Sequence, residues 1–158
     1  MRISLGKKEV IHFIGIGGIG MSGLALIMKE LGFNVKGSDQ QISKNIDRLK
    51  KNRIKIQLGH KKKNISNATI IVVSSAIKKN NPEFIEAKNR KIPIYKRGEM
   101  LASIVSLYKN VVVAGSHGKT TTTSIVSTIF SKSNLDPTTI NGGVINSIGN
   151  SAKLGKGE

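Results

Sequence analysis

Two glycine-rich segments of the sequence have the residue types and the spacing that bind phosphate groups. Residues 15–20 read Gly-Ile-Gly-Gly-Ile-Gly and match the pattern G-x-G-x-x-G, and Asp39 follows nineteen positions after Gly20. Glycines let the backbone approach a pyrophosphate, and a helix that starts at such a loop points its free N–H groups and positive dipole end at the anion. The pattern predicts a site for a nucleotide diphosphate, for which NAD is the default ligand. The alternative is that the glycines serve only a tight turn.

The second segment, residues 115–120, reads Gly-Ser-His-Gly-Lys-Thr and resembles a phosphate-binding P-loop. In such a loop the backbone amides surround the phosphates, the lysine neutralises the β- and γ-phosphates, and the following hydroxyl binds Mg²⁺. The strict pattern G-x-x-x-x-G-K-[ST] is not met, because its first glycine would fall on Val113. We predict phosphate binding here, against the alternative of a chance Gly-Lys-Thr at a helix start.

Alternating strands and helices are expected to position both loops. Residues 10–14 form a short apolar run before the first loop, and four apolar side chains starting at Met21 recur at i, i+3, i+4 and i+7, a helical face that Gly32 can end. Strands are further expected at residues 33–37, 54–58, 69–73 and 92–95, helices at residues 42–51, 82–91 and 98–107, and a polar, solvated loop at residues 61–67. This alternation predicts an α/β fold, a Rossmann-like doubly wound parallel sheet with strand 69–73 at its centre.

A second domain is expected to begin after Asn110. Residues 1–110 carry 22 basic and 7 acidic side chains, whereas residues 111–158 carry 4 and 2. A strand at residues 111–114 and a helix after the second loop start a new α/β cycle, and residues 134–158 show no closing element. Residues 111–158 alone are too few to bury an α/β core. We therefore predict one complete domain at residues 1–110 and the truncated beginning of a P-loop-type α/β domain at residues 111–158.

The composition narrows the classes of partner. The net charge of +17 invites a nucleic-acid hypothesis, but lysine dominates the basic residues, Trp is absent and there are only 2 Tyr, so groups that read or stack on bases are scarce. A solvated basic surface without a nucleic-acid partner is expected. With no Cys, no secretory leader and no long apolar run, we expect a cytoplasmic protein that does not bind membranes.

Six short motifs give the sequence a specific resemblance. They are G-I-G-G-I-G-M-S-G at residues 15–23, G-S-D at 37–39, S-S-A-I at 74–77, N-P-E at 81–83, G-E-M-L-A at 98–102 and G-S-H-G-K-T-T-T-T at 115–123. In order and spacing they resemble the Mur ligases, and among these the members that join L-alanine to UDP-N-acetylmuramate. His117 and the M-S-G after the first loop are similar to those members in particular. The resemblance covers essentially the whole chain.

The resemblance implies two binding sites, one for a UDP-sugar in the first domain and one for ATP in the second. The residues implied for the UDP-sugar are Gly17, Gly18, Ile19, Gly20, Ser38, Asp39, His60 and Ser75. The residues implied for ATP are Gly115, Ser116, His117, Gly118, Lys119, Thr120 and Thr121. The glycine-loop amides would bind the UDP diphosphate, and the other four residues of the first set would lie around the nucleoside and sugar.

The implied reaction transfers the γ-phosphoryl group of ATP to the muramyl carboxylate, after which L-alanine attacks the acyl phosphate. Lys119 would be the catalytic cation and Thr120 would ligate Mg²⁺. The acidic partner of the metal and the domain that brings L-alanine would lie beyond residue 158. We therefore expect residues 1–158 to bind a UDP-sugar without turnover.

Two other classes of function remain open at the level of sequence. An NAD(P)-dependent oxidoreductase with Asp39 on the adenosine ribose would explain the first loop but would leave the second without a role. A basic nucleic-acid-binding module would explain only the net charge.

Overall fold

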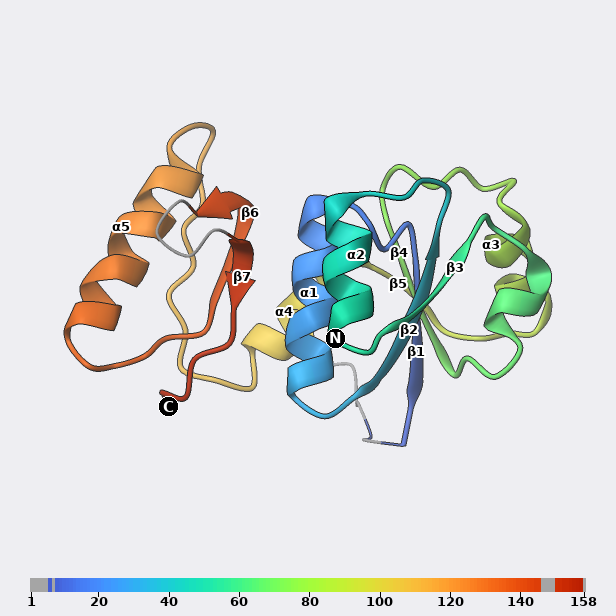
Figure 1. Ribbon diagram of the computed structural model, residues 1–158, viewed down its shortest axis with the longest axis horizontal. Coiled ribbons are helices and arrows are strands. Elements are labelled where there is room, and N and C mark those ends of the chain that lie inside the picture. The colour runs from blue at the N-terminus through green and yellow to red at the C-terminus, as the bar shows by residue number, and fades with distance from the viewer. Residues whose placement is uncertain (1–5, 7, 146–149, 158) are drawn as a thin grey trace.

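A five-stranded parallel sheet forms the centre of the protein (Figure 1). The computed structural model describes residues 6, 8–145 and 150–157. Its sheet consists of β1 (Val10–Ile14), β2 (Asn34–Asp39), β3 (Lys55–Leu58), β4 (Ile70–Val73) and β5 (Ile94–Lys96). Their spatial order is β3-β2-β1-β4-β5, and every neighbouring pair is parallel. This order confirms the Rossmann-like α/β fold. The chain builds the sheet outward from β1 in one direction and then, from β4, in the other, which is typical of a doubly wound sheet.

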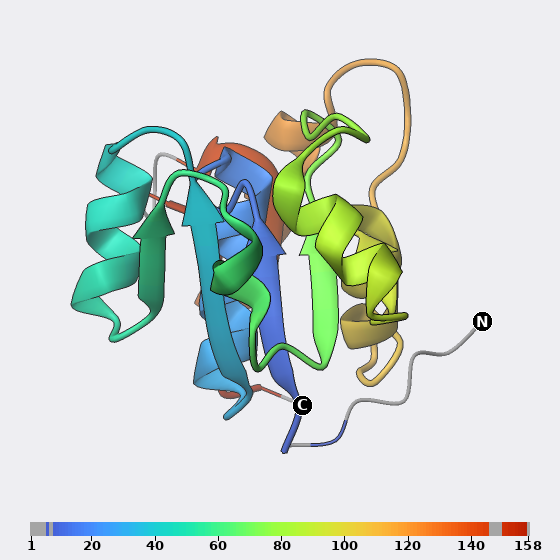
Figure 2. The same ribbon diagram turned by 90° about the vertical axis from the view of Figure 1, so that its right-hand side faces the viewer.

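Helices cover both faces of the sheet. They are α1 (Ile19–Glu30), α2 (Lys44–Lys51), α3 (Pro82–Asn89) and α4 (Arg97–Val105), with a short 3-10 helix, η1 (Lys62–Ile65). Helices α1, α2 and α4 lie on one face, and α3 with η1 lies on the other, as the turned view makes clear (Figure 2). Each face has its own apolar core, and β1 serves both, since Phe13 packs toward α1 and Ile14 toward α3.

Helix α1 is buried on all sides, which the single predicted stripe did not anticipate. Its eight consecutive residues from Met21 to Met28 are all buried. The helix ends as expected at Gly32, which has φ +89°, and the N–H of Phe33 donates to the carbonyl of Met28 to close the last turn. An all-round apolar helix requires cover on its outer side as well as from the sheet.

That cover is a β-hairpin from the end of the chain. Strands β6 (Thr139–Ile145) and β7 (Asn150–Lys153) pair antiparallel, and both pack against α1. Ala152 is 3% exposed and belongs to the α1 core, and Arg48 Nη2 donates to its carbonyl at 3.4 Å. The expectation that residues 134–158 show no closing element is therefore wrong. The two glycines and the asparagine of β6 suit strands poorly, so the segment gave no strand signal.

The expected strand at residues 111–114 is not formed. These residues have no regular secondary structure, and Val111 and Val112 are 64% and 71% exposed. A strand needs a neighbour for its backbone groups, and in the part of the chain described here no strand pairs with this segment. The following helix α5 (Lys119–Lys132) does form, but none of its residues is buried. The domain division at residue 110 stays a prediction.

The expected solvated loop at residues 61–67 is also corrected. It contains η1, in which Asn64 and Ile65 are buried against α3. The lysines of this segment gave it a polar appearance, but its asparagine and isoleucine point into the protein. Within the described residues, no helix is long and apolar enough to cross a membrane.

Candidate nucleotide-binding site

The first glycine loop lies at the carboxyl edge of the sheet, directly after β1 and beside the end of the neighbouring strand β4. This is the position at which open α/β sheets bind ligands. Gly15 has φ +79°, a left-handed conformation that favours glycine, and the N–H groups of Gly15 and Ile16 both donate to the carbonyl of Ser38 at 2.9 and 3.0 Å. The end of β2 thus holds the loop in place.

Asp39 already interacts with the loop as an anion. Its Oδ2 accepts a hydrogen bond from the N–H of Gly17 at 2.8 Å, and Asn45 Nδ2 donates to the Gly17 carbonyl at 2.8 Å. A Cβ atom on Gly17 would come within 3.0 Å of that carboxylate oxygen. The loop therefore has an amide that binds a negatively charged oxygen, and Asp39 occupies it.

Arg97 brings a positive charge to the same place. It begins α4, directly after β5, and a Cβ atom on Gly20 would lie only 2.9 Å from its Nη1. The guanidinium therefore lies against Gly20 in the first turn of α1, where the helix N–H groups have no acceptor within the helix. Sequence reasoning missed this residue, although its place at the carboxyl end of a parallel strand was a usable signal.

Ser75 is also near this loop. It follows β4 and is exposed, and the preceding Ser74 would come within 3.1 Å of a Cβ atom on Gly15. On the other side, Asp39 lines a small pocket whose walls are largely apolar. The pocket is lined by Asp39, Gln41, Ile42, Ile46, Lys50, Ile56 and Leu58. The carboxyl edge thus combines amides, a guanidinium and an adjoining apolar hollow.

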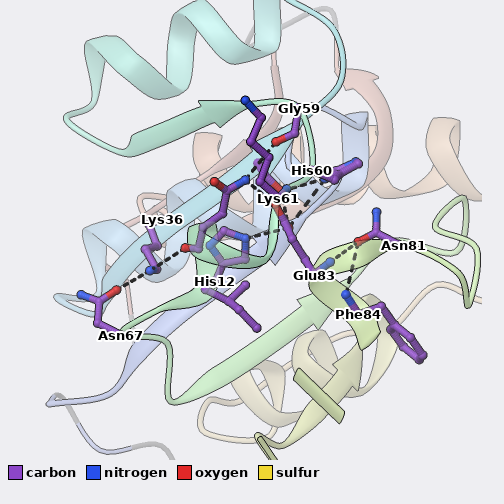
Figure 3. A network of polar contacts seen from close by, with 12 residues as sticks. His12, Lys36, Gly59, His60, Lys61, Asn67, Asn81, Glu83 and Phe84 are labelled. Atoms are coloured by element: carbon purple, nitrogen blue, oxygen red, sulfur yellow. Dashed lines mark hydrogen bonds and ion pairs between the residues drawn. The ribbon is translucent and has the colours of Figure 1, made fainter. Parts of the chain in front are cut away.

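Ser38 and His60 come together, but in a buried network rather than on an open surface (Figure 3). Ser38 is fully buried, its Oγ donates to Glu83 Oε2 at 2.6 Å, and His60 Nδ1 lies 3.0 Å from the same Oγ. Glu83 is itself fully buried and also contacts His12 Nε2 at 3.1 Å. Neither His12 nor Glu83 was predicted as a site residue, because they lie 71 positions apart in sequence.

Burial and hydrogen bonding set the charges in this network. Burial lowers the pKa of His12 more than the bond to Glu83 raises it, so His12 is neutral at physiological pH. Burial alone would raise the pKa of Glu83, but the hydrogen bonds from His12, Ser38 and Asn64 hold the pKa below its ordinary value. The pair is therefore a hydrogen bond between a neutral imidazole and a carboxylate.

These two shifts predict a loss of stability in acid. A depressed His12 pKa gives stability that is present above the ordinary 6.5 and is lost as pH falls toward the folded-state pKa. The lowered Glu83 pKa adds stability that is present above 4.5 and is lost at still lower pH. The free energy of unfolding in urea should therefore fall between about pH 7.5 and about pH 5.5, and His12→Gln should flatten this part of the curve. An unchanged slope in the variant would contradict the assignment.

The second glycine loop folds around its own lysine. Gly115 and Gly118 have φ +147° and +75°, and Lys119 begins α5. Lys119 Nζ donates to the carbonyls of Gly115 and Ser116 at 2.5 and 3.0 Å. The predicted residues Ser116, His117, Thr120 and Thr121 are exposed around it. The ammonium is thus held over the loop and bonds to neutral carbonyls, which leaves its charge available to an anion.

No acidic cluster stands beside this loop in the described residues. The Thr120 carbonyl accepts hydrogen bonds from Ser124 Oγ at 2.8 Å and from Asn141 Nδ2 at 3.2 Å. Over residues 6, 8–145 and 150–157, no group of three or more His, Cys, Asp or Glu side chains could hold a metal ion. The predicted metal ligand Thr120 thus belongs to no such group in this part of the chain.

Comparisons with known proteins identify the family of this chain. A sequence profile described as "Mur ligase family, catalytic domain" matches residues 10–109. The chain is 71% identical to the UDP-N-acetylmuramate–L-alanine ligase of Pelagibacter ubique (strain HTCC1062), over all of this chain and 34% of that protein. It is 53% identical to the ligase of the same name from Methylorubrum populi, over 96% of this chain and 32% of that protein. The chain thus spans about a third of the length of these relatives.

Solved structures show the same fold. The UDP-N-acetylmuramate-alanine ligase of Thermotoga maritima matches with a TM-score of 0.86 and 32% identity, over 94% of this chain and 35% of that one. A UDP-N-acetylmuramate:L-alanyl-gamma-D-glutamyl-meso-diaminopimelate ligase of Neisseria meningitides matches with a TM-score of 0.84 and 32% identity, over 92% and 46%. With a profile that matches most of its length and with these relatives, the chain belongs to the Mur ligase family.

Proposed function

We propose that this chain is the part of a UDP-N-acetylmuramate:L-alanine ligase that binds the UDP-sugar and supplies the phosphate loop for ATP. The observation that carries the proposal is that one glycine loop at the start of α1 has an amide, at Gly17, that binds a carboxylate oxygen and has the Arg97 guanidinium against Gly20. Amides and a cation at a helix N-terminus suit a diphosphate. The names of the relatives supply the sugar nucleotide and the amino acid.

In the first site, the amides of Gly17, Gly18, Ile19 and Gly20 bind the diphosphate, and Arg97 neutralises it. Asp39 releases Gly17 when the ligand arrives and faces the nucleoside, which lies toward the apolar pocket beside Ile42 and Ile46. Ser75 and His60 lie at opposite sides of this edge, and Ser38 contributes through its carbonyl, which holds the loop.

In the second site, Gly115–Gly118 and Thr121 surround the phosphates of ATP, and Thr120 offers its hydroxyl to Mg²⁺. The fit of these residues rests on the left-handed glycines and on an ammonium that bonds only to neutral loop carbonyls within the described chain. ATP supplies the phosphoryl group that activates the muramyl carboxylate, and Lys119 stabilises negative charge on that group. L-Alanine and the acidic partner of the metal belong to parts of the ligase outside this chain.

The alternative of an NAD(P)-dependent oxidoreductase has no support from the relatives named above, which carry ligase names. The proposed reaction needs a nucleotide-activated sugar and ATP, and the absence of Cys fits a reducing compartment, so we propose a cytoplasmic location.

Calorimetric titration of the 158-residue chain tests the proposal. UDP-N-acetylmuramate and UDP should bind at one site, and NADH should not displace them. Coupled phosphate release by this chain alone should stay at background when ATP and L-alanine are added. Tight NADH binding that competes with UDP would favour the oxidoreductase instead.

Arg97→Ala should weaken UDP binding by about tenfold, because a charge-assisted contact to a phosphate contributes about 1.5–3 kcal/mol at most sites and less where water screens it. The matched control is Lys55→Ala, which removes one exposed positive charge at the amino-terminal end of β3, the opposite edge of the sheet. Equal affinities of the two variants would show that Arg97 acts only through net charge.

A further inference from the structure

The Glu83 carboxylate accepts four hydrogen bonds, which is all that an ionised carboxylate can comfortably take (Figure 3). Oε2 is bonded to His12 Nε2 at 3.1 Å and Ser38 Oγ at 2.6 Å. Oε1 accepts from Asn64 Nδ2 at 2.5 Å and from the N–H of Lys61 at 3.2 Å. An acceptor-only group surrounded in this way requires every neighbour to present a hydrogen.

This requirement fixes the hydrogens of the neighbouring side chains. Ser38 has a single hydroxyl hydrogen, and it points to Glu83. The contact of 3.0 Å between Ser38 Oγ and His60 Nδ1 must therefore be donated by the imidazole. In a neutral ring with its hydrogen on Nδ1, the other nitrogen, Nε2, carries a lone pair and accepts hydrogen bonds.

His60 Nε2 faces out of the buried network. The backbone beside it is held at the carboxyl edge, because the N–H of Gly59 donates to the Asp39 carbonyl at 2.7 Å. The His60 side chain is 5% exposed. In the described residues, the buried side-chain atoms without a partner are His12 Nδ1 and Gln57 Oε1, so Nε2 keeps its contact with solvent. A single imidazole nitrogen thus remains open to solvent just after the end of β3.

We infer that Glu83 is a positioning residue that, through Ser38, sets the tautomer of His60 so that Nε2 accepts a hydrogen bond from the nucleoside of the bound ligand. The inference rests on the proposed function, since it concerns the same UDP site. The donor is an N–H or O–H group, and a uridine nucleotide offers both, the imide N–H of uracil and the hydroxyls of ribose. A lone pair at Nε2 repels phosphate oxygens, so this nitrogen selects the neutral part of the ligand.

Glu83→Gln tests this relay, the chain of hydrogen bonds that runs from Glu83 through Ser38 to His60. The substitution keeps the side-chain shape but should reverse the direction of the hydrogen bond between Ser38 and His60. The glutamine oxygen must stay with Lys61 and Asn64, both of which only donate here. Its NH₂ then faces Ser38, whose hydroxyl turns to donate to His60 Nδ1. Long-range ¹H–¹⁵N spectra of the imidazole rings should show the Nδ1–H tautomer of His60 in the wild-type chain and the Nε2–H tautomer in the variant. His117, which lies in the other loop, is the internal control.

Ligand analogues identify the donor. UDP should bind the Glu83→Gln variant about tenfold more weakly, since a donor at Nε2 would then face a donor on the ligand. In the wild-type chain, either N3-methyl-UDP or a 2′- or 3′-deoxy-UDP should bind about tenfold more weakly than UDP. That discrimination should vanish in the variant. Thermal unfolding of the variant checks that it is folded.

The outcomes distinguish the inference about His60 from the proposed function. If wild-type His60 is the Nε2–H tautomer, or if UDP and all its analogues bind equally, the inference is wrong although the UDP site stands. If the wild-type chain does not bind UDP at all, the proposed function itself fails. Should Glu83→Gln not fold, Ser38→Ala, which cuts the relay and leaves the carboxylate in place, is expected to abolish the fixed Nδ1–H tautomer and the discrimination among analogues.

Discussion

Lys119→Ala, placed in a complete ligase that carries this sequence, is expected to lower ATP-dependent turnover by about 10²–10³-fold or more while UDP-sugar binding stays near normal. The ammonium is the one group in the second loop that can neutralise charge developing on the transferred phosphoryl group, and its Nζ already lies within hydrogen-bond distance of Gly115 and Ser116. Coupled phosphate release measures the turnover, and calorimetry measures the binding.

The matched control for this prediction is Lys132→Ala. Lys132 is an exposed residue in the last turn of the same helix, so its loss changes the charge of α5 equally without touching the loop. Turnover that is unchanged in the Lys119 variant would overturn the assignment of residues 115–120 as a phosphate loop.

The second large effect is expected for Gly37→Ala, in the middle of β2. A Cβ atom there would lie 2.7 Å from the carbonyl oxygen of Phe13 and 2.6 Å from Cδ1 of Ile16. The first of these atoms belongs to the backbone of the neighbouring strand and cannot turn away, so the sheet must shift. We expect a loss of about 2–4 kcal/mol in the free energy of unfolding, together with weaker UDP binding because Ile16 belongs to the glycine loop.

Gly98→Ala provides the comparison, because nothing lies within 4 Å of a Cβ atom at that position in α4. It should be neutral or slightly stabilising, since alanine is the better helix former. Urea unfolding of the three proteins decides the matter, and similar stabilities for the two variants would contradict the close approach at Gly37.

Local sequence patterns were sufficient for the sheet and for its first loop. The run at residues 10–14 coincides with β1, and the alternation with helices gave the parallel, doubly wound order. The prediction failed where structure depends on distant partners. Residues 111–114 have a strand composition but no neighbour to pair with in the described chain, whereas β6 has a poor strand composition and pairs with β7.

The residues of the candidate site differ in the same way in how far the sequence predicts them. Asp39 and the glycine loop could be read from the sequence because their spacing is local to one βαβ unit. Glu83, in α3, could not, since its role depends on His12, Ser38 and Asn64, which come from two strands and a 3-10 helix. Arg97 lies against Gly20 only because the sheet order brings the end of β5 near the start of α1.

The hairpin on α1 also bears on how the chain can be divided. Ala152 shares a core with β1 and α1, and Ile140 and Leu154 pack against that core. A protein cut after residue 110 would leave the outer side of an apolar helix uncovered, and such a surface promotes self-association. The contacts between the hairpin and α1 therefore cross the predicted division at Asn110, and a chain shortened for study should keep the hairpin.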